Sequence, residues 1–298
     1  LALGARRMAE RNAIVRRLSA VETLGSVTVL ATDKTGTLTQ AQMVVEHLWT
    51  PQRSVGVSGQ GYAPEGELVA AGARIDLEHA PDVVDLLRAA ALCNDGRLVP
   101  PSAENEAWTG LGDPTECALL TVAAKAGLDK AGLDRRHPRV GEIPFDSATQ
   151  RMTTVHESAS GAPGQVVVVS KGSVEALRAA HGHGGHAHLW HEASLRAAEL
   201  AGQGFRVLAV TAGETSDVGR WEHVEQRLLG LVAMNDPAKP AARAYWLCPA
   251  VMASMAAFFT ISGASKSGNP CPRLTALYSV ASRLIVVVAL LAAVALLG

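Results

Sequence analysis

The sequence offers little that would place it in a specialised class of protein. Lysine and arginine (27) nearly balance aspartate and glutamate (28), so the formal net charge is −1 and no nucleic acid or other acidic polymer is expected as a partner. The four cysteines are scattered without a CxxC pair, which favours a reduced, cytosolic setting over a disulfide framework. No repeat of fixed period is present.

The amino-terminal end lacks two familiar features. The residues from Leu1 onward do not show the basic region followed by an apolar core that is typical of a secretory signal. The chain also starts without Met, which predicts a fragment, or equally a processed or trimmed chain. Its 298 residues are enough for one large or two modest domains.

The most informative stretch that is present is the heptad at residues 33–39, DKTGTLT. The apolar, β-branched run at residues 27–32 predicts a buried strand of a parallel sheet ending in a tight turn. Asp33 would then lie at the carboxyl end of a strand, where open α/β sheets bind their ligands. Such a carboxylate can attack a phosphoryl group and become an aspartyl phosphate. The alternative, an ordinary turn with an exposed Asp, is disfavoured by seven consecutive residues of restricted type.

The residues that follow Asp33 suit a phosphate ligand. Lys34 would add positive charge, Gly36 would allow close backbone approach, and Thr35 and Thr37 would offer hydroxyl and N–H groups. The heptad resembles the phosphorylation signature of the P-type ATPases, ion pumps that phosphorylate themselves on an Asp. The resemblance implies ATP and Mg²⁺ as cofactors, with Asp33 and Thr35 as part of the magnesium site.

Position 35 separates this family from a related one. Phosphatases of the haloacid-dehalogenase type carry a second Asp two positions after the nucleophile, as a general acid and base, whereas this chain has Thr35. Without that acid a phosphoenzyme would hydrolyse slowly, as a pump requires. Thr35 therefore argues against a soluble phosphatase-like hydrolase, which stays an alternative.

The first 25 residues resemble the cytoplasmic stalk of the calcium- and sodium/potassium-type branch of the pumps. Five arginines lie among apolar residues between positions 1 and 18, so a solvated amphipathic helix is the simpler interpretation. Ser19 and Glu22 form a capping box, which predicts a short helix from Ala20 to Gly25.

A second compact unit follows, in which predicted strands alternate with predicted helices. This alternation is typical of an α/β or α+β unit. We expect a strand beginning at Val44, a loop over 52–66, a helix over 82–93, a helix with Asp113 as N-cap and Pro114 in its first position, strands at 144–155 and 166–172, a helix over 192–202 and a strand over 205–210.

Five residues of this unit match, in order, the nucleotide-binding domain that P-type pumps insert after the phosphorylation signature. By this resemblance Glu116 faces the adenine amino group, Phe145 stacks on the base, Lys171 and Gly172 close the base pocket and Arg206 meets the phosphates. Each residue alone has an ordinary structural explanation, so their shared order carries the inference.

Two local features complicate this picture. The family usually has a basic pair after Phe-Asp-Ser-x, whereas this chain has Thr149 and Gln150 with only Arg151 cationic, which predicts weak ATP binding. Histidines are dense between His181 and His191, among glycines; a loop that picks up metal adventitiously is favoured over a dedicated site.

Residues 230–240 resemble the family's strand that returns to the phosphorylation domain, with Asp236 as a further nucleotide-side residue and Lys239 in place of Arg. The resemblance ends near Arg243. Neither the family's Thr-Gly-Asp loop nor its magnesium-binding Gly-Asp-Gly-x-Asn-Asp loop occurs in residues 243–298. We therefore expect slow or absent phosphoryl transfer in this chain.

The last part of the chain is apolar. Residues 245–261 carry no charge and are long enough to span a bilayer, and residues 284–298 are more apolar but shorter. Either this tail is a helical membrane hairpin, or it is an unrelated amino-acid sequence produced by a frameshift or rearrangement of the gene. The abrupt end of the resemblance favours the second explanation.

Together these observations predict an α/β fold, with an incomplete haloacid-dehalogenase-like phosphorylation domain and an inserted α+β nucleotide-binding domain. The expected boundaries are 1–25 for the stalk, 26–42 and 230–243 for the phosphorylation domain, 43–229 for the nucleotide-binding domain and 244–298 for the tail. The function expected is that of a cation-transporting P-type ATPase at a membrane, with residues 1–243 cytoplasmic and this chain inactive. An ATP-binding module without turnover is the alternative.

Overall fold

The computed structural model describes residues 2–10, 34–103, 106–159, 164–182 and 187–239. The chain divides into two compact units, unit 1 with residues 1–40 and 238–298 and unit 2 with residues 41–237. The predicted helix at 20–25, the predicted strand at 27–32 and the apolar tail lie outside the described residues. Of the described residues, no helix combines the length and the apolar character needed to cross a membrane.

Unit 2 combines helices with strands, as the sequence predicts. Its described elements, in chain order, are β1 (Val44–Thr50), β2 (Arg53–Val57), β3 (Leu68–Ala70), β4 (Ala73–Arg74), η2 (Leu77–His79), α3 (Pro81–Leu92), β5 (Arg97–Val99), β6 (Thr109–Leu111), α4 (Pro114–Lys125), α5 (Lys130–Arg136), β7 (Arg139–Asp146), β8 (Arg151–Glu157), β9 (Val166–Gly172), α6 (Val174–His181), α7 (Ala187–Gly202), β10 (Arg206–Thr215), η4 (Val218–His223) and β11 (Arg227–Asn235).

The main sheet of unit 2 has nine strands in the order β4-β3-β2-β1-β11-β10-β9-β8-β7, and each neighbouring pair is antiparallel. Strands β5 and β6 form a separate two-stranded ribbon. The first and last strands of the unit, β1 and β11, pair side by side near the middle of the sheet, with Val44 opposite Asn235. The chain therefore enters and leaves unit 2 at adjacent positions.

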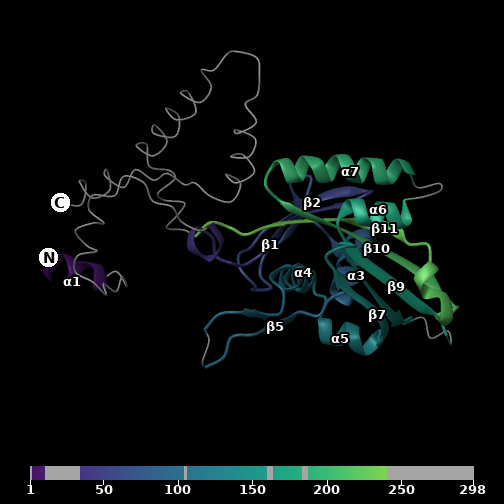
Figure 1. Ribbon diagram of the computed structural model, residues 1–298, viewed down its shortest axis with the longest axis horizontal. Coiled ribbons are helices and arrows are strands. Elements are labelled where there is room, and N and C mark those ends of the chain that lie inside the picture. Colours follow the sequence, from purple (N-terminus) through teal and green to yellow (C-terminus); the bar gives the residue numbers. More distant parts are fainter. Residues whose placement is uncertain (1, 11–33, 104–105, 160–163, 183–186, 240–298) are drawn as a thin grey trace, which may run out of the picture. The chain divides into compact units, whose positions relative to one another are not determined.

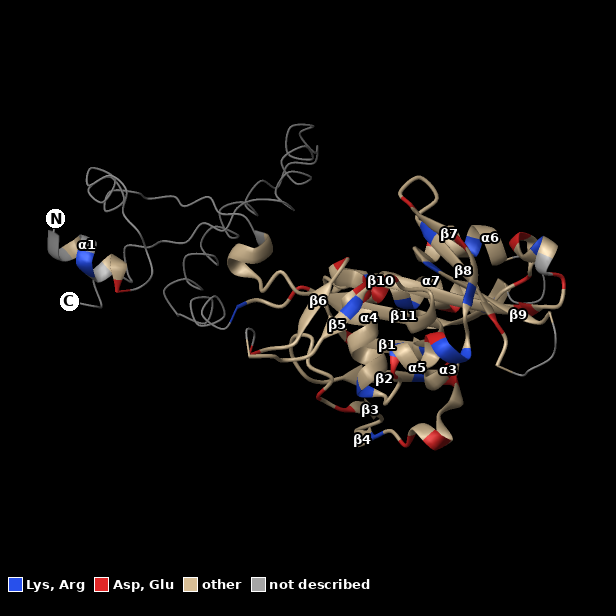
Figure 2. Ribbon diagram, turned by 90° about the horizontal axis from the view of Figure 1, so that it is seen from below, with Lys and Arg blue, Asp and Glu red and all other residues tan. Residues whose placement is uncertain are grey.

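Helices cover both faces of this sheet. Figure 1 shows α3, α4 and α5 on one face and α6 and α7 on the other. The first face holds the larger core, which includes Leu86, Leu87, Leu119 and Met234, and the second holds a smaller one around Trp190, Leu177 and Leu231. Because both faces are covered, the central strand β11 is buried from Leu228 to Met234. Figure 2 shows Lys and Arg interspersed with Asp and Glu along the elements of unit 2, in keeping with the near-zero net charge.

Several predicted elements are confirmed. Helix α3 occupies the predicted helical stretch at 82–93 to within a residue, and α7 contains the stretch predicted at 192–202. Helix α4 begins as the sequence predicts: the Asp113 side chain accepts a hydrogen bond from Thr115 N at 2.7 Å, and Pro114 occupies the first turn. The valine-rich stretch at 166–172 forms β9.

Two expectations differ from the structure. The loop predicted at 52–66 is wrong over β2, where buried Val55 and Val57 alternate with more exposed residues in the period of a strand. The stretch at 230–235, expected as a strand of the phosphorylation domain, lies instead in the sheet of unit 2 between β1 and β10.

The described part of unit 1 is small. Helix α1 (Ala2–Ala9) carries an exposed Arg6–Glu10 ion pair of 3.2 Å. A short helical turn, η1 (Lys34–Leu38), is interrupted at Gly36, whose φ of 74° is a conformation that glycine adopts readily. An isolated antiparallel bridge joins Thr39 to Ala238.

Candidate functional site

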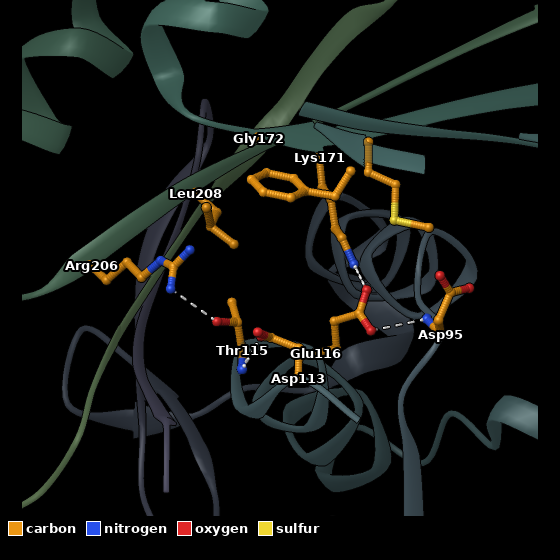
Figure 3. A pocket seen from close by; sticks show the side chains of 10 residues that line it. Asp95, Asp113, Thr115, Glu116, Lys171, Gly172, Arg206 and Leu208 are labelled. Carbon is orange, nitrogen blue, oxygen red and sulfur yellow. Dashed lines mark hydrogen bonds and ion pairs between the residues drawn. The ribbon is translucent and has the colours of Figure 1, made fainter. Parts of the chain in front are cut away.

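Unit 2 contains a pocket of about 260 Å³ (Figure 3). It lies where the first turn of α4 and the turn between α3 and β5 face the strands β7 to β10. The residues that line it are Asp95, Asp113, Thr115, Glu116, Phe145, Met152, Lys171, Gly172, Arg206 and Leu208. Its volume is slightly below the range typical of ligand sites, ~300–1,000 Å³, so it suits a base or nucleoside-sized group rather than a whole triphosphate.

A buried ion pair forms one side of the pocket. Lys171 Nζ lies 2.5 Å from Glu116 Oε1, and the two side chains are only 8% and 14% exposed. The second carboxylate oxygen, Glu116 Oε2, accepts a hydrogen bond from Asp95 N at 3.3 Å. Each oxygen keeps a further lone pair, so a carboxylate held from two sides can still accept a hydrogen bond from a ligand donor.

Apolar side chains form the walls beside this ion pair. Met152 is buried, and Leu208 is partly buried against the large core. Phe145 is 58% exposed, which is high for a phenyl ring. Phe145 lines the pocket, where a planar ligand could stack on the face of its ring.

Arg206 lies across the pocket from Lys171 (Figure 3). Its Nη1 donates a hydrogen bond to Thr115 Oγ1 at 3.2 Å, which ties the start of β10 to the first turn of α4. The guanidinium retains further N–H donors, and the amino-terminal end of α4 adds positive potential beside it. This side of the pocket therefore suits an anionic group.

Gly172 is required by the close approach of another strand end. A Cβ at this position would lie 2.5 Å from Gln150 O and 2.9 Å from Arg151 Cβ. Gln150 itself has a φ of 50° and accepts hydrogen bonds from Ser173, through Oε1 at 3.1 Å and through its backbone O at 3.0 Å. Its side chain is therefore turned toward the first turn of α6.

The structure brings together five of the residues that the sequence assigned to a nucleotide. Glu116, Phe145, Lys171, Gly172 and Arg206 come from four separate elements and line the same pocket. The sixth does not line it: Asp236 Oδ1 accepts a hydrogen bond from Gln42 N at 3.3 Å, where the chain leaves the sheet.

The predicted catalytic residues belong to unit 1. Asp33 lies outside the described residues, and Lys34 begins the turn η1. Thr35 and Thr37 are exposed on this turn. Lys239 holds the turn from the other segment, because its Nζ donates to Gly36 O at 2.7 Å and its backbone N donates to Leu38 O at 2.8 Å.

Sequence reasoning missed five lining residues: Asp95, Asp113, Thr115, Met152 and Leu208. Asp113 and Thr115 carried a usable signal, since the helix start predicted at Pro114 places both next to Glu116. Asp95 lies in a turn whose position relative to Glu116 depends on the packing of α3 against α4. Met152 and Leu208 are ordinary strand residues without a local signal.

Two other groups of chemically active side chains are less suited to a site. Burial raises the pKa of the Cys93 thiol, whose Sγ lies 3.7 Å from Met152 O, and so disfavours the reactive thiolate. His183 and His186 of the histidine-rich stretch, where the sequence favours a loop over a dedicated metal site, lie outside the described residues. Within the described part of the chain no group of three or more His, Cys, Asp or Glu residues could hold a metal ion.

Comparison with known proteins finds consistent similarities. Residues 82–183 match the family model described as P-type ATPase, cytoplasmic domain N. The chain is 40% identical over 262 residues to the probable cation-transporting ATPase F of Mycobacterium tuberculosis (strain ATCC 25618 / H37Rv), a match that covers 81% of this chain and 27% of that protein. It is 46% identical over 182 residues to the cation-transporting ATPase pma1 of Synechocystis, covering 59% of this chain and 19% of that protein.

A third relative is the calcium-transporting ATPase of Bacillus subtilis, 34% identical over 258 residues, with 82% of this chain and 28% of that protein covered. The matches thus span between 19% and 28% of the length of these three curated relatives.

Proposed function

Because this chain belongs to the P-type cation-transporting ATPase family, we propose that unit 2 is its nucleotide-binding domain and that the pocket around Glu116 and Lys171 binds the adenosine part of ATP. The observation that carries the proposal is the convergence of five sequence-assigned residues from separate elements on one pocket.

Different residues of the pocket contact different parts of the nucleotide in this proposal. The Glu116 carboxylate, fixed by Lys171 and by Asp95 N, accepts a hydrogen bond from the adenine amino group. The exposed ring of Phe145 stacks on the base. Arg206, on the opposite side, receives the first phosphates while the rest of the triphosphate extends out of the pocket.

The nucleophile belongs to the other unit in this proposal. Asp33 would attack the γ-phosphorus, forming an acyl phosphate while the bond to the β–γ bridging oxygen breaks and ADP leaves. The turn η1 and the segment around Lys239 would be part of a haloacid-dehalogenase-like phosphorylation domain, with the stalk over 1–25 and the tail over 244–298, while the nucleotide-binding domain would take residues 41–237, β11 included. Mg²⁺ would neutralise charge on the phosphates, with Asp33 and Thr35 among its ligands.

Cation transport at a membrane is the proposed activity of the protein to which these residues correspond. A polypeptide of only these 298 residues would bind ATP without useful turnover, because its sequence contains no Gly-Asp-Gly-x-Asn-Asp segment. The phosphatase-like alternative has less support, since Thr35 occupies the position of the general acid.

Titration calorimetry of the full chain with ATP tests the binding proposal. We expect weak binding, and we expect Phe145→Ala to raise the Kd about 10-fold because base–aromatic stacking contributes ~1–3 kcal/mol. The matched control is Val140→Ala, since Val140 is also exposed (49%) on β7 but does not line the pocket. A folded parent chain that binds no ATP at millimolar concentration would overturn the proposal.

A further inference from the structure

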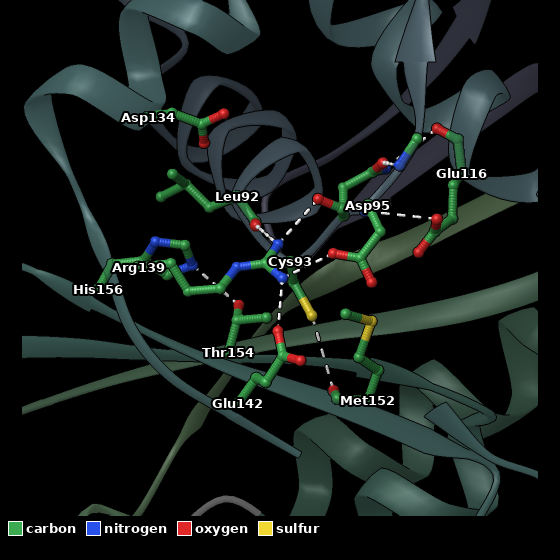
Figure 4. Close-up of polar contacts among 12 residues, drawn as sticks. Leu92, Cys93, Asp95, Glu116, Asp134, Arg139, Glu142, Met152, Thr154 and His156 are labelled. Atoms are coloured by element: carbon green, nitrogen blue, oxygen red, sulfur yellow. Dashed lines mark hydrogen bonds and ion pairs between the residues drawn. The ribbon is translucent and has the colours of Figure 1, made fainter. Parts of the chain in front are cut away.

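Arg139 is the first residue of β7 and makes more polar contacts than its position outside the pocket would require. Its side chain is 26% exposed. The guanidinium makes four hydrogen bonds, drawn in Figure 4: Nη1 donates to Asp95 Oδ1 at 2.6 Å and to Glu142 Oε2 at 2.7 Å, and Nη2 donates to Asn94 O at 2.9 Å and to Leu92 O at 3.3 Å.

The acceptors on one side are the last backbone carbonyls of α3 and of the turn that follows it. Carbonyls at a helix carboxyl terminus have no partner within the helix and carry partial negative charge. The guanidinium of Arg139 binds two of them, Leu92 O and Asn94 O, and so fixes the path of the chain immediately after α3.

The segment held in this way is also part of the pocket wall. Asp95 lines the pocket, and its backbone N donates to Glu116 Oε2 at 3.3 Å. Asn94 Nδ2 donates to Glu116 O at 3.0 Å, while Asn94 Oδ1 accepts from Gly96 N at 2.8 Å. The position of the Glu116 carboxylate therefore depends on the turn that Arg139 holds.

The strand that carries Arg139 also supplies a second wall of the pocket. Phe145 lies on β7, six positions further along the same strand. One end of β7 is tied through Arg139 to the turn behind Glu116, and the other end presents the ring of Phe145 to the same cavity. The contact thus links the two groups that would hold a base, one by stacking and the other by hydrogen bonding.

We propose that Arg139 is a positioning residue for base recognition: it fixes the turn at Asn94 and Asp95, and thereby holds the Glu116 carboxylate where it accepts from the amino group of adenine and repels the carbonyl oxygen of guanine. This inference rests on the proposed binding of ATP in the pocket. A site built to hydrogen-bond one group rejects an analogue that lacks it, so loss of the positioning contact lowers discrimination as well as affinity.

A purely structural role makes a different prediction. If Arg139 only caps α3, its loss lowers stability but leaves the ratio of ATP to GTP affinity unchanged below the melting temperature. Arg53 is a matched control at the other end of α3, because its guanidinium binds Asp82 Oδ1 at 3.1 Å and its side chain is 30% exposed. It does not line the pocket.

The experiment compares Arg139→Met, Arg139→Lys and Arg53→Met with the parent, all as the full chain. Binding of ATP, GTP and inorganic tripolyphosphate is measured by calorimetry well below each melting temperature. We expect Arg139→Met to raise the Kd for ATP about 5- to 10-fold relative to the parent. The Kd for GTP should stay within about 2-fold of the parent value, and the Kd for tripolyphosphate should not change. Arg53→Met should keep the parent's ATP-to-GTP ratio.

Arg139→Lys keeps the charge but not the four directed bonds, so it should change the ratio in the same direction by a smaller amount. This milder variant decides the question if the Met variant does not fold. An unchanged ATP-to-GTP ratio in a folded Arg139 variant, or an equal loss of tripolyphosphate binding, would overturn the inference while leaving the proposed function intact. A parent chain that binds neither nucleotide would overturn the proposed function itself.

Discussion

The two units of this chain differ in how much of a working site their described residues contain. Unit 2 has a nine-stranded sheet, helices on both faces and a pocket lined entirely by its own residues. In unit 1 the described residues form one helix, one turn and one isolated bridge, and Asp33 lies outside them. In the proposed function, binding of the base thus belongs to unit 2 and phosphoryl transfer to unit 1.

This difference indicates that the two steps can be separated experimentally. Binding of the base needs only side chains held by one folded sheet, whereas phosphoryl transfer needs groups from several segments to be held at once around the reacting phosphorus. The following predictions test that separation, in order of decreasing expected effect.

The largest effect expected concerns Asp33. We expect a chain of these 298 residues to form an aspartyl phosphate at least about 100-fold more slowly than a complete pump, because loss of one preorganised electrostatic contact commonly costs ~10²–10³ in rate. Labelled ATP with Mg²⁺, acid quench and a gel measure it, with Asp33→Asn as the blank. A hydroxylamine-sensitive label formed within seconds on the parent alone would contradict the separation of binding from chemistry.

The second prediction concerns the buried ion pair of unit 2. Lys171→Met leaves the Glu116 carboxylate buried without its partner, so the unfolding free energy should fall by about 3 kcal/mol and ATP binding should be lost. Lys130→Met is the control, because it removes an i,i+4 pair with Asp134 that contributes at most about 0.5 kcal/mol. Equal losses of stability in urea denaturation of the two variants would count against this account.

The third prediction concerns the stability of unit 2 as a function of pH, which a buried histidine should affect. Burial lowers the pKa of His156 to about 4, and the charges of Arg139 and Lys130 act in the same direction. Between pH 6.5 and about 4 the unfolded chain therefore binds a proton that the folded chain does not, so stability falls as the pH falls, by up to about 3 kcal/mol.

Urea denaturation across this pH range measures the slope. His156→Gln is the comparison, since glutamine stays neutral and can still donate to His137 O, which lies 3.0 Å from His156 Nδ1. The variant should lose less stability on acidification than the parent. Identical pH slopes would show that other groups, such as carboxylates, account for the effect.

The smallest effect expected is a gain. Gln150→Lys replaces the side chain that accepts from Ser173 with a longer, flexible cation next to the pocket-lining Gly172, which can turn toward the phosphates of a bound nucleotide. It should lower the Kd for ATP by up to about 5-fold without changing the Kd for adenosine. Gln52→Lys adds the same charge in the turn between β1 and β2 and should have no effect. If calorimetry showed that both substitutions lower the Kd for ATP equally, the effect would not depend on a cation near the pocket.

Sequence reasoning succeeded where the signal was local. The start of α4 was predicted because Asp113 and Pro114 act within one helical turn, and β9 because four consecutive valines favour a strand. Strand β2 was missed because glycine, serine and proline nearby outweighed the alternation of Val55 and Val57.

Strand partners and long-range contacts were beyond the reach of such signals. A strand buried on both faces, such as β11, has the same continuous run of apolar residues in a parallel and in an antiparallel sheet. The sequence of β11 therefore does not show which strands it pairs with. The contact between Arg139 and Asp95 joins residues 44 positions apart and depends on the register of β7. The five pocket residues were found through a family resemblance, not through periodicity.

The pairing of β1 with β11 also bears on the order in which the chain can fold. The contact between Gly36 and Lys239 closes a loop of 203 positions in an unfolded chain. Once Val44 is held beside Asn235, only a few residues on either side of the ladder remain to be ordered. Loop-closure entropy grows as about 1.5RT ln n, so prior folding of the sheet lowers the cost of that contact by about 2 kcal/mol. If the sheet forms first, the contact between Gly36 and Lys239 therefore costs less loop-closure entropy than it does in a chain whose sheet is not yet folded.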